Sequence, residues 1–334
     1  MRKEWLARLL VIGAIVLALA LPAWGWWAAH QAGPILHARM AETGGWTPEN
    51  LTAEVGKPLR LRLTSDDVLH SFALGQSDLP PVDVKPGEIS EVTLNFDKPG
   101  KYVFYCTRWC SLNHWRMRGV IEVSDPSSAL PENPEPPLYV RLGLDLDAEH
   151  PAVEHLPEAR PSAGRGRALA EAIPAEYRSL DYYRAHSPYD LWTTLRGLPS
   201  LAGRSDQELW DAVASVWLSH SGSQEIAEAA TRYQTNCAAC HGQGGAGDGV
   251  FADELGGAGA EHGTQPAGEM TQRPTDFTDP AHMLVMSPAH LQGKLLRGGM
   301  GTGMPYWGPI FTDEQLWALV GYLWTFQFQE ANQP

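Results

Sequence analysis

The sequence predicts a multidomain protein with an N-terminal apolar helix, an all-β sandwich and an all-α C-terminal region. Three observations support this fold class. A mostly apolar run opens the chain, apolar and polar residues alternate in short segments between residues 51 and 123, and helical patterns with N-cap residues follow residue 166. A length of 334 residues leaves room for two folded domains and additional segments.

The apolar run extends from Leu9 to Ala29 and is just long enough to span a bilayer, which takes about 20 residues. Three basic residues precede it, so the positive-inside rule places the N-terminus in the cytoplasm. Residues 1–33 are therefore predicted to form a single-pass membrane anchor. A cleaved signal peptide is the alternative, because Ala18-Leu19-Ala20 resembles a cleavage site. Both interpretations place the remaining chain on the periplasmic or extracellular side.

The next part of the chain, residues 34–125, is predicted to be the β-sandwich domain, with residues 34–50 as a short linker into it. Strands with period-2 alternation are predicted at residues 59–63, 89–96, 101–105 and 119–123. Turn sequences rich in Pro and Gly separate these strands. Short strands at this spacing are typical of a sandwich.

Residues 126–165 are rich in Pro, Glu and Ala and are predicted to be a linker lying over the surface. Beyond them, two stretches, 187–210 and 287–317, share the same order of signals. Each has a Ser-Pro helix start, a Leu-Arg-Gly and a second Ser/Thr-Asp helix start. We interpret the first stretch as a degenerate copy of the second. The alternative is two similar helix pairs that arose by chance.

A cluster of potential metal ligands lies between the last two predicted strands. Cys106, Cys110, His114 and Met117 spell C-x3-C-x3-H-x2-M, and His70 lies upstream. Thiolates, imidazoles and a thioether suit copper rather than magnesium or calcium. The second thiolate allows both sulfurs to bridge two copper ions. The alternative is a Cys106–Cys110 disulfide with an incidental histidine and methionine.

This motif resembles the CuA cupredoxin domain of haem–copper oxidase subunit II, which also occurs in nitrous oxide reductase. The resemblance implies that Cys106 and Cys110 bridge two copper ions and that His70 and His114 each ligate one. It further implies that Met117 and the backbone carbonyl of Arg108 are weak ligands.

The sequence also departs from this family. Many subunits II carry Glu at the position of Arg108, where it helps to hold a magnesium ion at the interface with subunit I. Arg108 cannot do this. A single predicted membrane segment replaces the two that many members have, and the aromatic cluster that usually precedes the sandwich is not evident.

The second constellation is Cys237-Ala238-Ala239-Cys240-His241, the C-x-x-C-H attachment sequence of a c-type haem. Both cysteines would form thioethers to the haem, and His241 would ligate the iron. A sixth ligand is expected from Met304 or, as the alternative, Met300, because a methionine as the second axial ligand suits an electron carrier. A thioredoxin-like redox pair or half of a zinc site would be the other interpretations of the two cysteines.

This region, residues 223–334, resembles class I cytochrome c over residues 223–328. The preceding segment, residues 166–222, has the later helix signals but neither a C-x-x-C-H motif nor a methionine in the equivalent turn. We predict that it is a degenerate cytochrome c-like segment that binds no haem and serves as a spacer or docking surface.

The two resemblances together imply an electron-transfer subunit with one haem c and one CuA site. It would pass electrons from a soluble donor, such as a small cytochrome c, to the catalytic subunit I of a membrane haem–copper oxidase. No residue of the chain is assigned a catalytic role. A net charge of −14 suits a basic donor protein and argues against binding nucleic acid.

Two other functions are compatible with the same electron path. One is a CuA-containing nitric oxide reductase, which Arg108 and the single anchor favour. The other is a stand-alone membrane-anchored electron carrier. A nitrous oxide reductase proper is disfavoured, because the chain has no histidine-rich propeller.

Overall fold

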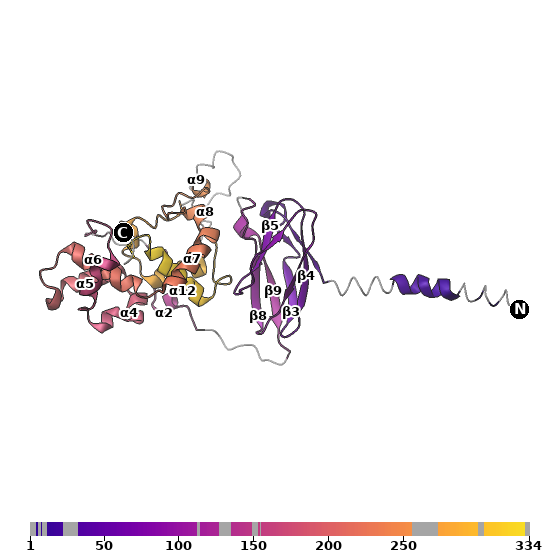
Figure 1. Ribbon diagram of the computed structural model, residues 1–334, viewed down its shortest axis with the longest axis horizontal. Helices are drawn as coiled ribbons and strands as arrows, with labels where there is room; N and C mark the ends of the chain where they lie inside the picture. The colour runs from indigo at the N-terminus through magenta and orange to yellow at the C-terminus, as the bar shows by residue number, and fades with distance from the viewer. Residues whose placement is uncertain are drawn as a thin grey trace. The chain divides into compact units, whose positions relative to one another are not determined.

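The computed structural model describes residues 5, 8, 12–22, 33–111, 114–126, 135–148, 153, 155–255, 273–299 and 304–330. The chain forms two compact units, Met1–Ala129 and Leu130–Pro334 (Figure 1). Residues 12–22 are helical. Within the described residues, no helix has both the length and the apolar character needed to cross a membrane. The predicted span from Leu9 to Ala29 lies partly outside those residues, so the anchor stays a prediction.

The first unit contains a sandwich of two sheets, as the alternating pattern predicted. A four-stranded sheet has the order β2-β1-β4-β7, and a five-stranded sheet has the order β3-β9-β8-β5-β6. The strands are β1 (Ile35–Ala38), β2 (Trp46–Thr47), β3 (Asn50–Glu54), β4 (Leu59–Ser65), β5 (His70–Leu74), β6 (Val82–Val84), β7 (Ser90–Leu94), β8 (Gly100–Tyr105) and β9 (Arg118–Ser124).

The segment 34–50 is not the simple linker that the sequence predicted. It contains β1 and β2 and the first residue of β3. β1 runs parallel to β4, and Leu36 and Ala38 of β1 are fully buried. These strands are short, and their alternation covers too few residues to be recognised from the sequence.

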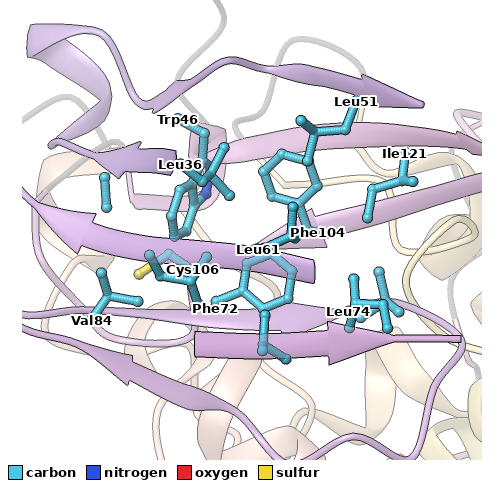
Figure 2. Close-up of a cluster of buried hydrophobic side chains, with 14 of the residues drawn as sticks. Leu36, Trp46, Leu51, Leu61, Phe72, Leu74, Val84, Phe104, Cys106 and Ile121 are labelled. Atoms are coloured by element: carbon cyan, nitrogen blue, oxygen red, sulfur yellow. The ribbon is translucent and has the colours of Figure 1, made fainter. Parts of the chain in front are cut away.

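The core of the sandwich lies between the two sheets. In β4 the alternation holds, with Leu61 and Leu63 buried. Trp46 packs edge-on against Phe104, with ring centroids 5.7 Å apart, and Phe104 stacks on Phe72 at 5.5 Å. Figure 2 shows Cys106 among these aliphatic and aromatic side chains. The buried core therefore extends directly to a predicted metal ligand.

The second unit is helical in the residues described. Its helices are α2 (Leu138–Arg141), α3 (Ala163–Ala170), α4 (Leu180–Ala185), α5 (Pro188–Arg196), α6 (Asp206–Leu218), α7 (Ser223–Asn236), α8 (Ala238–His241), α9 (Ala252–Leu255), α10 (Pro280–Met283), α11 (Pro288–Arg297) and α12 (Asp313–Trp324). The helix starts that the sequence predicted are all capped by a side chain. The capping residues are Ser187, Ser205, Ser287 and Thr312.

The two halves of this unit pair their helices in the same way. In the first half, α3 packs against α6, and Gly166 permits the contact because a Cβ there would lie 1.8 Å from the carbonyl oxygen of Asp211. In the second half, α7 packs against α12 beside Gly321. This correspondence supports the interpretation of residues 166–222 as a degenerate copy, which stays a prediction.

Part of the predicted linker is packed on the helical unit. We call residues 135–148 the docked segment. Tyr139 and Leu146 lie against α11 at Gly293, where a Cβ would meet both side chains at about 3 Å. Asp147 forms ion pairs with Lys294 and Arg297, with N–O distances of 2.9 and 2.6 Å. From its composition this stretch was predicted to be a linker, but it contains a helix, α2, and makes specific contacts with α11.

Candidate functional site

The structure brings the predicted copper ligands together at one end of the sandwich. Sγ of Cys106 lies 3.9 Å from Nδ1 of His70. Sγ of Cys110 lies 3.7 Å from Nδ1 of His114 and 3.3 Å from Sδ of Met117. The donor atoms of His70, Cys106 and Cys110 all lie within 4.8 Å of one another. Two sulfurs and two ring nitrogens therefore converge on one small volume.

Each ligand is placed by the end of a strand or by the loop between β8 and β9. His70 is the first residue of β5 and is fully buried. Cys106 directly follows β8, and its N–H donates to the carbonyl of Met117 at 3.2 Å, which closes the base of the loop. His114 starts a short 3-10 helix, and the Trp109 ring packs at a tilt against its imidazole, with ring centroids 4.7 Å apart.

Arg108 has its carbonyl and its side chain engaged separately. The carbonyl oxygen lies 3.3 Å from Sγ of Cys106. The guanidinium donates to both carboxylate oxygens of Asp83 on β6. The carbonyl therefore faces the sulfur cluster, as expected for a weak ligand.

The pKa values of the two cysteine thiols are shifted in opposite directions. A hydrogen bond from the Cys110 thiol holds the pKa of Cys106 far below its usual range, and the same bond raises the pKa of Cys110. Burial acts against the charged form of His70, but hydrogen bonds to Cys106 and Asp67 raise its pKa overall. A thiolate beside a second sulfur and two imidazoles attracts a cation.

Asp67 selects which nitrogen of His70 can bind a metal. Its Oδ1 lies 2.6 Å from Nε2 of His70, so this nitrogen carries the proton and donates it. In the neutral ring with its proton on Nε2, Nδ1, which lies 3.9 Å from Sγ of Cys106, is the nitrogen that can bind a metal. A carboxylate behind a histidine ligand fixes the tautomer and the ring orientation in many metal sites.

The donor set fits copper. It combines two thiolates, two imidazoles and a thioether, all of them soft or borderline ligands. His70, Cys106, His114 and Met117 are buried, and only Cys110 is partly exposed. Hard cations such as magnesium prefer carboxylates and water, and no carboxylate among the described residues joins this cluster.

The haem-attachment motif forms a single helical turn, α8. Nδ1 of His241 donates to the carbonyl of Thr275 at 3.1 Å, which leaves Nε2 for an iron ion. The imidazole stacks on Phe277, with ring centroids 4.6 Å apart. Burial lowers the pKa of His241, so the ring is neutral, as an iron ligand must be. Burial also raises the pKa of the Cys237 thiol to about 12.

The backbone after α8 folds back tightly on the motif. A Cβ at Gly249 would lie 2.3 Å from the carbonyl oxygen of Ala239, so only glycine fits there. The Tyr233 hydroxyl donates to the carbonyl of Gly242 at 2.8 Å. These contacts leave the two cysteines and His241 on one compact turn, which fits covalent haem attachment.

The assignment of the sixth ligand stays a prediction. Met304 is partly buried, and its carbonyl accepts a hydrogen bond from the N–H of Gly299 at 3.1 Å. Met300 lies outside the described residues.

Three residues of these sites were not found from the sequence. Asp67 had a usable signal, because it stands three residues before His70. Asp83 and Thr275 had none. Each acts on a residue more than 20 positions away, so only the fold brings the partners together.

Comparisons with known proteins agree with this division of the chain. The family model "Cytochrome C oxidase subunit II, periplasmic domain" matches residues 47–124, within the sandwich unit. The family model "Cytochrome c" matches residues 226–327, within the helical unit.

Similar proteins include two cytochrome c oxidase subunits 2 from Thermus thermophilus. Both are 35% identical over 100 residues, which is 29% of this chain. The match covers 73% of one relative and 59% of the other.

Solved structures with similarity include the periplasmic domain of cytochrome oxidase subunit II from Bradyrhizobium japonicum. It is 28% identical with a TM-score of 0.21, and the match covers 23% of this chain and 55% of that domain. A chain of a heme-copper terminal oxidase dimer is 22% identical with a TM-score of 0.24, covering 37% of this chain and all of that one. From the sequence matches, the chain belongs to the cytochrome c oxidase subunit II family, with a cytochrome c domain fused behind the subunit II domain.

Proposed function

We propose that this chain is the electron-input subunit of a membrane haem–copper terminal oxidase. Electrons from a soluble donor, such as a small cytochrome c, enter at haem c, pass to a dinuclear CuA site and leave to the catalytic subunit I, which reduces oxygen. The observation that carries this proposal is the convergence of Cys106, Cys110 and His114, in the loop after β8, with His70 at the start of β5, in a chain that also holds a C-x-x-C-H turn.

In this proposal, the residues of the sandwich hold and shield the copper ions. Cys106, Cys110, His70 and His114 would hold the copper ions. Met117 and the Arg108 carbonyl would be weak ligands. Bound copper and haem supply reversible one-electron transfer. The residues themselves fix the donors in place and exclude water, since four of the five side-chain ligands are buried.

The cytochrome c domain would hold its haem by covalent bonds to Cys237 and Cys240 and by axial bonds from His241 and Met304. With His241 and Met304 both bound to it, the iron would have no open position for a substrate. Neither site then performs substrate chemistry, and the role of the chain is electron delivery.

Residues 1–33 would anchor the chain, with the N-terminus in the cytoplasm and both units on the periplasmic or extracellular side. The net charge of −14 supports association with a basic donor protein by electrostatic steering. Such steering weakens as ionic strength rises.

Nitric oxide is the alternative terminal acceptor, and one observation favours keeping it. The Arg108 side chain is paired with Asp83, so this position offers no carboxylate to a magnesium ion at an interface with subunit I. The electron path would be the same, and only the catalytic subunit would differ.

The test is purification of the complex from membranes. The oxidised protein should show the electron paramagnetic resonance signal of a mixed-valence copper pair, and reduced cytochrome c should support oxygen consumption. Turnover with nitric oxide alone would establish the alternative. Absence of a partner subunit would make the chain a stand-alone carrier, and absence of the copper signal would refute the CuA site.

The predicted absence of haem from residues 166–222 is tested by measuring the number of haems per chain. One covalent haem per chain is expected, and the double variant C237A/C240A should contain none. Because residues 166–222 contain no cysteine, a haem there would be non-covalent, so a second, non-covalent haem in the wild-type chain would show that the degenerate segment binds one.

A further inference from the structure

The ion pair between Arg108 and Asp83 is bidentate. Nη2 of Arg108 lies 2.9 Å from Oδ1 and 3.0 Å from Oδ2 of Asp83, and Nε lies 3.1 Å from Oδ1. A planar guanidinium held by both carboxylate oxygens is fixed in orientation as well as in position. The ion pair with Asp83 thus links the side chain of Arg108 to β6.

Asp83 sits beside a residue that holds the same loop. In the antiparallel ladder of β5 and β6, Asp83 is directly opposite Ser71, which follows the ligand His70. The N–H of Ser71 donates to Sγ of Cys106 at 3.4 Å, and its hydroxyl oxygen accepts from the N–H of Thr107 at 2.8 Å. One rung of this ladder therefore holds three consecutive loop residues, Cys106, Thr107 and Arg108.

The carbonyl of Arg108 belongs to this held segment. It lies 3.3 Å from Sγ of Cys106, while its side chain extends to Asp83. Rotation of the peptide group after Arg108 would move the carbonyl relative to Sγ of Cys106. The ion pair opposes this rotation, because the guanidinium of the same residue is held by Asp83. Both partners of the pair are about half exposed, and exposed ion pairs contribute little to fold stability. Positioning of the carbonyl therefore explains the bidentate contact better than stability does.

We propose that Asp83 is a positioning residue of the copper site, acting through Arg108. The bidentate pair sets the place of the Arg108 carbonyl beside Cys106, and so sets how strongly this weak ligand can act on the copper ion. This inference rests on the proposed CuA site. The group that touches the metal is the carbonyl, and Asp83 does not.

A simple field effect is the competing explanation, and charge-changing variants separate the two. If only the field matters, D83N removes a negative charge and raises the reduction potential of copper, whereas R108Q removes a positive charge and lowers it. The double variant D83N/R108Q would then return close to the wild-type potential. If positioning matters, both single variants lose the same bidentate ion pair. Their potentials and copper hyperfine splittings should shift in the same direction by similar amounts, and the double variant should add nothing.

R108K provides a second test, because it keeps the charge and loses the bidentate fork. Positioning predicts the same shift as in R108Q, and a field effect predicts none. The matched controls are K101Q and E122Q, which break an exposed ion pair of 2.9 Å between β8 and β9. They should leave the copper spectrum and potential unchanged.

The measurements are electron paramagnetic resonance, copper content and potentiometry on the copper-loaded full chain. Opposite shifts in D83N and R108Q, or a wild-type spectrum in R108K, would overturn the inference. If D83N does not fold, R108K alone decides. A wild-type protein without the mixed-valence signal would instead refute the proposed function.

Discussion

Oδ1 of Asp67 lies 2.6 Å from Nε2 of His70, and the same carboxylate also accepts hydrogen bonds from two backbone N–H groups. The N–H of Met40 donates at 2.7 Å, and that of Val68 donates at 2.6 Å. These two backbone hydrogen bonds therefore fix the Asp67 carboxylate in place independently of its contact with His70. Burial acts to raise its pKa, but these hydrogen bonds lower it overall. The carboxylate is ionised at neutral pH and orients the imidazole.

The first prediction concerns this orientation. Asp67→Ala should weaken copper binding by about 10- to 100-fold, because His70 loses the partner that fixes its tautomer. Competition with a chelator of known affinity measures the change. Asp66→Asn is the control, since Asp66 pairs with His37 and Arg39. Equal affinities of Asp67→Ala and wild type would show that the carboxylate has no such role.

The second prediction decides the sixth haem ligand. Met304→Ala should abolish the methionine-to-iron charge-transfer band and lower the haem reduction potential, because a thioether ligand raises it. Met300→Ala should retain both properties. Visible spectroscopy and potentiometry of the oxidised full chain make the comparison. The opposite pattern would assign the ligand to Met300.

The third prediction concerns the close packing of the haem turn. Gly249→Ala would place a Cβ 2.3 Å from the Ala239 carbonyl oxygen, and this contact is with backbone that cannot swing aside. Covalent haem content should fall, and the free energy of unfolding should drop by about 1–3 kcal/mol. Gly244→Ala is the control, because its Cβ would meet no atom within 4 Å. A similar loss in both variants would indicate a general effect of chain stiffness.

The fourth prediction concerns the docked segment. Hydrogen bonds from Arg297 and Lys294 hold the pKa of Asp147 far below its usual value. A folded-state pKa below the unfolded one means that the carboxylate stabilises the fold above the unfolded value of about 3.9. This contribution is lost as pH falls towards the folded-state pKa. Because Asp147 is about half exposed, solvent screening limits its stabilisation to about 0.2–1 kcal/mol.

Asp147→Asn should therefore lower the free energy of unfolding at pH 7 by that amount and by less at pH 3. Urea unfolding followed by fluorescence measures it at both pH values. Salt at 1 M should reduce the difference at pH 7, since it screens exposed charges. A difference that does not depend on pH would mean that the side chain acts by packing.

The features that the sequence predicted well are local ones. The strands predicted at residues 59–63 and 119–123 lie in β4 and β9, where alternation over five residues already defines a buried face. The helix starts at Ser187 and Thr312 were recognisable, because a cap involves residues only three positions apart. The candidate copper ligands cluster for the same reason, since most of them lie in one loop.

The features that the sequence did not predict depend on strand pairing and on docking. Asp83 meets Arg108 only because the register of β5 and β6 places it opposite Ser71. The docked segment has the composition of a linker, and its contacts with α11 follow from a gap at Gly293 and from two cations spaced along one helix. Neither relation leaves a pattern in the neighbouring sequence.

The position of His70 at the start of β5 has a consequence for the rate of electron transfer at the proposed copper site. β5 is buried along its whole length and is hydrogen-bonded to β6 on one side and β8 on the other. His70 is paired with Val84 of β6 and cannot shift without disturbing that pairing, so its geometry would be nearly the same whichever charge a bound copper ion carried. A preorganised site needs no rearrangement at the moment of reaction. If the site holds copper as proposed, each electron transfer would therefore have a small reorganisation energy.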